Sequence, residues 1–121
     1  MSRDWQIYLD DIVASCEKVQ RYTKGMNQQD FLQNEQTYDA VVRNLEIVGE
    51  AAKHIPDDVR KGMSEIDWPK VAGLRDILAH DYFGIDNDIL WDIIRNKVPD
   101  LMKAVGGYLR KKNKKRLYLN L

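Results

Sequence analysis

Three residues that could act together on a phosphate stand in one short segment, RDILAHDYFGID, at positions 75–86. The imidazole of His80 can exchange a proton near neutral pH, and the carboxylate of Asp76 can orient such a ring. The guanidinium of Arg75 can hold two phosphate oxygens and stabilise the charge that builds up in a transition state. This set suits metal-independent RNA cleavage, in which the 2′-hydroxyl attacks the adjoining phosphate.

The spacing places these residues, and Tyr82 beyond them, on two neighbouring strips of a helix. With Arg75 at 0° and about 100° per residue, Tyr82 lies at about 340°, two turns away on the same side. Asp76 and His80 lie at about 100° and about 140°, one turn apart on the adjoining side. One helix therefore offers two strips rather than a compact triad, and a complete site is expected to need a second copy of it.

The same residues also have an ordinary structural interpretation. A histidine in the last turn of a helix interacts favourably with the exposed carbonyl groups, and a surface arginine forms ion pairs. A tyrosine packs its ring in the core and keeps its hydroxyl at the rim. On spacing alone, this interpretation is favoured over the catalytic one.

Helical periodicity dominates the chain, and alternating strand-like patterns are nearly absent. Amphipathic helices are predicted over residues 4–22, 35–54, 68–83 and from 86 onward, with a short helix after Pro56. Four long helices with short connections predict an all-α fold, an antiparallel four-helix bundle with an additional short helix.

Four single residues have predicted structural roles within these helices. Cys16 shares the apolar stripe of the first helix, which favours a small core residue over a nucleophile. Asn44 lies in the apolar arc of the second helix and is predicted to be a buried amide satisfied by a neighbouring helix. Gly84 is predicted to end the third helix in the left-handed conformation, and Pro99 to kink the fourth.

Charge is unevenly distributed along a chain whose formal net charge is zero. Residues 110–116, RKKNKKR, hold six of the 19 basic residues and no acidic one, so residues 1–109 carry 13 basic and 19 acidic side chains, a net of −6. The chain is therefore divided into a helical domain, 1–109, and a basic tail, 110–121. The tail could bind phosphate, or it could be a solvated, frayed helix end, and composition alone favours the latter.

Composition also excludes several classes of protein. No window of eighteen apolar residues is present, so no membrane association is expected, and acidic residues near the start favour a cytoplasmic protein over a secreted one. The only cysteine cannot form an internal disulfide, and two histidines offer no zinc-ligand cluster. No metal and no cofactor is expected.

The segment from Arg75 to Tyr82 resembles the R-x4-H-x-Y motif of the HepT-like toxins in the HEPN superfamily, which belong to HEPN/MNT toxin–antitoxin systems. Arg75, Asp76, His80 and Tyr82 fill this motif without departure. The resemblance continues upstream in RNLEIVGEAAK and downstream in DYFGID, Trp91 and the Val98-Pro99 pair. It covers most of the chain and leaves out the basic tail.

The resemblance implies a HEPN-like bundle that forms a homodimer, with two motif helices meeting across a cleft. It implies a ribonuclease toxin with RNA, and by family tRNA, as substrate, with Arg75 and His80 as the catalytic pair and Asp76 as their polar support. It also implies neutralisation by an MNT-type nucleotidyltransferase antitoxin that transfers AMP to Tyr82. The alternative is a non-catalytic helical partner or nucleotide-binding module of a nucleotidyltransferase.

Overall fold

The computed structural model describes residues 4–80 and 84–119; within its helices, the side chains at positions 4, 75–77, 79, 80 and 116–118 lie outside the description. All regular structure in these ranges is helical, which confirms the predicted all-α class. The longer helices are α1 (Asp4–Thr23), α3 (Glu35–Ala52), α5 (Trp68–His80) and α7 (Val98–Leu119). Short helices are α2 (Gln28–Gln33), α4 (Asp57–Lys61), which is the predicted short helix, and α6 (Asn87–Asp92), while Ile93–Lys97 form a π-helix, η2.

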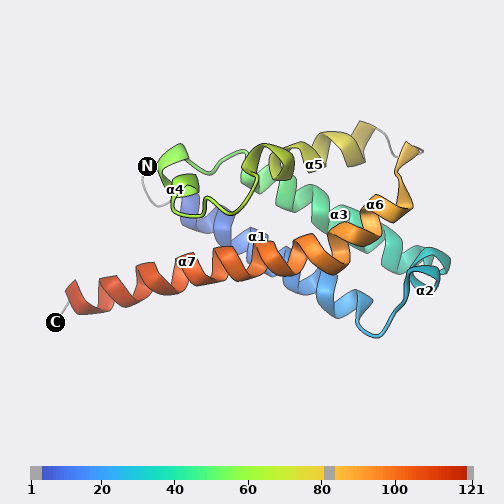
Figure 1. The fold of residues 1–121 in the computed structure, drawn as a ribbon, viewed down its shortest axis with the longest axis horizontal. Coiled ribbons are helices and arrows are strands. Elements are labelled where there is room, and N and C mark those ends of the chain that lie inside the picture. Colours follow the sequence, from blue (N-terminus) through green and yellow to red (C-terminus); the bar gives the residue numbers. More distant parts are fainter. Residues whose placement is uncertain (1–3, 81–83, 120–121) are drawn as a thin grey trace.

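Helix α3 is central to the arrangement (Figure 1). It packs against α1 and against α5, and α1 packs in turn against α7. The helix that carries the motif, α5, therefore has α3 as its principal neighbour and lies at one edge of the bundle. Among the described residues, no helix is both long enough and apolar enough to cross a lipid bilayer.

The predicted apolar stripes form the core. They contribute fully or almost fully buried side chains from α1, α3 and α7, namely Leu9, Ile12, Cys16, Val19, Val41, Leu45, Val48, Ala52, Val98, Leu101 and Val105. Apolar burial of this kind is the main favourable term in the folding of a helical bundle.

Cys16 is a core residue, as its position on the stripe predicts. Its side chain has no solvent exposure. Burial, with a smaller contribution from the Glu17 carboxylate, raises the pKa of the Cys16 thiol to about 12. The thiol is therefore neutral at physiological pH, and the nucleophilic thiolate form is suppressed.

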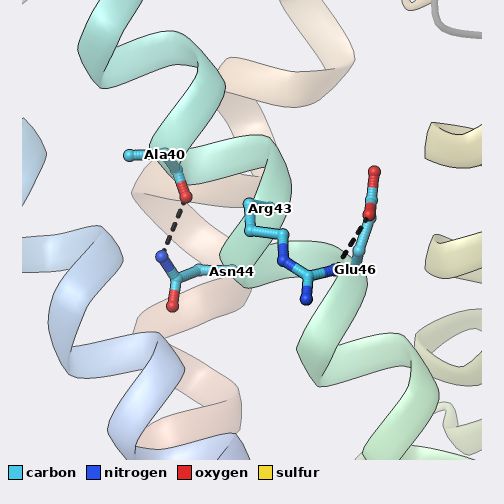
Figure 2. Close-up of polar contacts among 4 residues, drawn as sticks. All are labelled: Ala40, Arg43, Asn44 and Glu46. Carbon is cyan, nitrogen blue, oxygen red and sulfur yellow. Dashed lines mark hydrogen bonds and ion pairs between the residues drawn. The ribbon is translucent and has the colours of Figure 1, made fainter.

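Asn44 is buried as predicted, and the described part of the chain gives it a partner within its own helix. Its side-chain amide donates a hydrogen bond of 2.8 Å to the carbonyl oxygen of Ala40, one turn earlier in the same helix (Figure 2). The side chain reaches its own backbone because an i−4 carbonyl is within range of a short polar side chain. This local bond satisfies one donor of the buried amide, and a contact of its other polar atoms with a neighbouring helix stays a prediction.

Two predicted helix boundaries also differ from those observed. Gly84 does not have a positive φ; the glycine in the left-handed region is Gly25, with φ of 77°, directly after α1. The break near Pro99 is a π-helical turn before the proline, in which the Val98 N–H donates to the carbonyl of Ile93, five residues back. Pro99 has no N–H to donate and its ring would crowd the preceding turn, so a wider turn there relieves the clash.

Arg95 links this π-helical turn to the C-terminal end of α1. Its Nη2 atom donates to the carbonyl oxygens of Met26 and Thr23, and its guanidinium lies 4.4 Å from the centroid of the Trp91 ring. These carbonyls follow or close α1, where no intrahelical partner is available. Arg95 therefore links the α6–α7 junction to the α1–α2 connection.

Candidate active site

Helix α5 is fixed at its start by contacts with the segment before it. The side chain of Asp67 accepts a hydrogen bond of 3.3 Å from the Lys70 N–H, which caps the first turn. Trp68 is 3% exposed, and its indole N–H donates to the carbonyl of Met63 at 3.3 Å. The Arg60 guanidinium lies 5.9 Å from the Trp68 ring centroid. The position of α5 is thus set before the motif begins.

The chain beyond the motif is fixed as well. Asp86 caps α6 by accepting hydrogen bonds from the N–H groups of Asp88, at 2.9 Å, and Ile89, at 3.2 Å. The Tyr38 hydroxyl of α3 donates to the side-chain oxygen of Asn87 at 2.9 Å. Burial and the neighbouring Asp39 carboxylate raise the pKa of Tyr38, which keeps this donor protonated. The chain after the motif is therefore attached to α3 through the Tyr38–Asn87 bond.

The predicted site residues fall on the last part of α5 and just after it. The backbone of α5 includes residues 75–80, so Arg75, Asp76 and His80 belong to one helix, as predicted. Their side chains lie outside the described part of the chain, as does all of Tyr82. The predicted approach of the guanidinium and the imidazole to one another therefore stays a prediction.

Gly73 shows that one face of α5 is open. A Cβ atom built at Gly73 would meet nothing within 4 Å. His80 follows seven residues later, two helical turns on, so helical register places residues 73 and 80 on the same face. The opposite side is covered, since Leu78 is only 3% exposed. Gly73 itself is half-buried, but no atom of the described residues would contact a Cβ there, so this part of the face that carries position 80 has room for a further group.

The open position at Gly73 was missed by reasoning from the sequence. A glycine inside a helix costs about 1 kcal/mol relative to alanine, and no packing within this chain requires one here. Its neighbours Val71, Ala72 and Leu74 are only partly buried although they are apolar. The sequence feature that could have predicted this open position is a glycine inside a helix, among apolar residues. Such a glycine is typical of a surface that a second chain approaches closely.

Charged residues of α3 lie on the side away from Asn44. Arg43 and Glu46 form an ion pair with 3.7 Å between Nη1 and Oε2, and Figure 2 shows both side chains on the opposite side of α3 from Asn44. The Arg43 side chain is 72% exposed and that of Glu46 only 25% exposed. An ion pair this exposed on one side contributes little to stability.

Two hollows on the described surface are lined by residues outside the second half of α5. One, of about 430 Å³, is lined by residues of α4 and by the start of α5, including Arg60, Trp68 and Pro69. Another, of about 460 Å³, lies between the segment after α4 and α7. Over residues 4–80 and 84–119, no three His, Cys, Asp or Glu side chains are grouped as metal ligands would be.

Comparison with known proteins decides the family. The family model described as "Ribonuclease HepT-like" matches residues 12–106, which include α5 and the whole motif. The chain belongs to the HepT-like ribonuclease family. The matched region stops before residues 110–116, so the basic segment of this HepT-like chain lies outside the family match.

Curated relatives agree with this assignment. A protein of Thermococcus cleftensis named "probable ribonuclease HepT" is 41% identical over 101 residues, which is 84% of this chain and 92% of that protein. A protein of Caldanaerobacter subterraneus named "putative RNase" is 39% identical over 104 residues, 86% of this chain and 93% of that protein.

A longer relative contains a similar region. The Methanocaldococcus jannaschii protein named "gamma-glutamylcyclotransferase and putative RNase" is 37% identical over 105 residues, which is 87% of this HepT-like chain. The match spans only 47% of that protein, less than half of its length. No solved structure matches the chain.

Proposed function

We propose that this chain is a metal-independent endoribonuclease that acts as the toxin of a toxin–antitoxin pair. The observation that carries the proposal is membership of the HepT-like ribonuclease family over residues 12–106, with the Arg75, Asp76, His80 and Tyr82 motif intact. The position of α5 at the edge of the bundle, with an open face at Gly73, supports it. RNA, including tRNA, is the proposed substrate, and the cytoplasm the proposed location.

The proposed reaction is an internal transesterification at one phosphodiester of the RNA. The 2′-hydroxyl oxygen attacks the phosphorus, the bond to the 5′-oxygen breaks, and the products are a 2′,3′-cyclic phosphate and a free 5′-hydroxyl. His80 moves a proton between these oxygens, and Asp76 orients the imidazole. Arg75 stabilises the negative charge that accumulates on the equatorial oxygens of the pentacoordinate phosphorus. The protons balance, and no external reagent is consumed.

A homodimer is proposed because one helix holds its motif residues on two adjoining strips. A twofold axis beside α5 would bring Arg75 of one subunit near His80 of the other. The open face at Gly73 leaves room for such an approach, and the half-buried Val71 and Leu74 offer apolar area to cover. The dimer thereby completes the site.

The test is cleavage of RNA in excess EDTA by the purified full-length chain. We expect total RNA to be degraded, and we expect a defined RNA oligonucleotide to yield a 2′,3′-cyclic phosphate end. The matched control is the same oligonucleotide with 2′-O-methyl groups, which cannot supply the attacking hydroxyl and should stay intact. Intact RNA in all samples, with no toxicity when the chain is expressed, would favour the non-catalytic partner of a nucleotidyltransferase.

Neutralisation is proposed to occur by AMP transfer from an MNT-type nucleotidyltransferase, which would supply ATP and magnesium, to the Tyr82 hydroxyl. A bulky anionic adduct two residues from His80 would fill the cleft and repel a phosphate backbone. Tyr82→Phe keeps the ring and removes the acceptor oxygen, so we expect complete loss of AMP incorporation by the cognate antitoxin. Intact-mass spectrometry provides the measurement, with Tyr22→Phe as the matched control, and an adduct that persists in Tyr82→Phe would place the acceptor elsewhere.

A further inference from the structure

The last part of α7 extends away from the bundle (Figure 1). Helix α7 runs continuously from Val98 to Leu119. Leu109 is the last residue on it that packs against the core, and every described side chain from Arg110 onward is exposed. We name residues 110–119 the arm. At 1.5 Å rise per residue, the arm is about 15 Å long.

The arm carries a dense positive charge. Arg110, Lys111, Lys112, Lys114 and Lys115 all have exposed side chains, and no acidic residue follows Asp100 in the sequence. At about 100° per residue, these five cations cover about 200° of the helix circumference. Like charges three and four residues apart repel one another, which destabilises an isolated helix by a few tenths of a kcal/mol per pair. A bound polyanion would relieve this repulsion.

The rest of the molecule makes the arm's charge significant. Residues 1–109 carry a net charge of −6, which opposes the approach of a nucleic acid. Attraction of a phosphate backbone must therefore come from local positive charge, and the arm holds the densest cluster of basic residues in the sequence.

We infer that the arm is an electrostatic RNA-binding element, which holds the phosphate backbone of the substrate without reading its sequence. This inference rests on the proposed ribonuclease function for its choice of polyanion. An anionic lipid surface fits less well, because a helix that lies on a membrane needs a continuous apolar face. Residues 110–116 include no apolar residue, and the apolar residues of the arm, Leu117, Tyr118 and Leu119, are consecutive at its end, so they form no continuous apolar face along it.

The test is RNA binding by the full-length chain with His80→Ala, which separates binding from cleavage. In the arm variant, the residues replaced by glutamine are Arg110, Lys111, Lys112, Lys114 and Lys115. The matched control carries five exposed lysines of the body changed to glutamine, Lys18, Lys24, Lys61, Lys70 and Lys97. Both variants lose five positive charges, and glutamine keeps a helix propensity close to that of lysine.

The measurement is fluorescence anisotropy with a labelled single-stranded RNA of about 20 nucleotides, over a range of KCl concentrations. If about three arm side chains contact phosphates, the log–log slope of affinity against salt should fall by about 2 in the arm variant, and affinity at 0.1 M salt should fall about 100-fold. The affinity and the salt slope of the body variant should stay close to those of the His80→Ala parent. An equal loss in both variants, or no loss in the arm variant, would overturn the inference.

A second binding experiment tests whether the basic arm binds anionic lipid instead of RNA. Vesicles of phosphatidylglycerol replace the RNA, and a vesicle affinity that depends on the arm while RNA affinity does not would overturn the inference in favour of a membrane surface. Because His80 is absent throughout, a failure of the wild-type chain to cleave RNA would refute the proposed function without altering these binding results.

Discussion

Replacement of His80 by alanine is expected to slow RNA cleavage by about 10²–10⁴-fold, the usual contribution of a positioned general acid or base. Arg75→Ala should cause a loss of similar size, because it removes the charge that stabilises the transition state. Both variants should keep the helical fold, because alanine has the highest helix propensity of all residues. The measurement is the initial rate of cleavage of a defined RNA in EDTA, with circular dichroism as the control for folding.

Mixing the two inactive variants tests how the site is built. If Arg75 of one subunit works with His80 of the other, a heterodimer of Arg75→Ala and His80→Ala keeps one complete site and one doubly damaged site. After random exchange of subunits, about half of the dimers are heterodimers, so about a quarter of the wild-type sites should be restored. If each subunit holds a complete site by itself, mixing restores nothing, and the composite site is refuted.

Gly73→Lys is expected to weaken the dimer by about 100-fold or more and to reduce cleavage in parallel. A Cβ at Gly73 meets no atom of the described residues within 4 Å, and a lysine can extend its flexible side chain outward, so the monomer should fold about as stably as the wild type. In a twofold interface the added side chain occurs twice, and overpacking costs about 1–3 kcal/mol at each occurrence. Lysine is chosen because its positive charge does not repel RNA.

Gly73→Ala is the matched control for this prediction. A methyl group at Gly73 has no neighbour within 4 Å in the chain and should stabilise the helix by about 0.5–1 kcal/mol, with a smaller effect on the dimer. Sedimentation at several concentrations measures the dimer, and thermal unfolding measures the fold. A Gly73→Lys protein that stays dimeric and fully active would show that the subunits do not meet at this face.

Much of the fold follows from local patterns in the sequence. The stripe of Leu9, Ile12, Cys16 and Val19 predicts both the first helix and its buried face, because residues at three- and four-residue steps share one side of a helix. The second helix follows in the same way. These predictions hold because apolar burial is the dominant energy, and it acts on each helix regardless of its partner.

The sequence predicts less where local geometry depends on a contact or on a choice between similar local states. Asn44 could bond to a neighbouring helix or to its own, and only the packed structure selects Ala40. Either glycine could have adopted positive φ, and the turn after α1 selects Gly25. The site is predictable as a motif on α5, but the openness at Gly73 depends on which helix lies beside it, and periodicity does not contain that information.

The π-helical turn before Pro99 affects which side of the helix the apolar residues of the last third of the chain face. Leu90, Ile94 and Val98 are all buried and follow one another at four-residue intervals. In a regular helix two such intervals drift by about 80° around the axis, so the three residues would spread over most of the width of one apolar face. The five-residue bond from Val98 to Ile93 absorbs this drift and realigns the apolar residues of α7 with α1. The π-helical turn therefore sets the rotation of α7 about its own axis. It also sets the direction in which the basic side chains beyond Leu109 point.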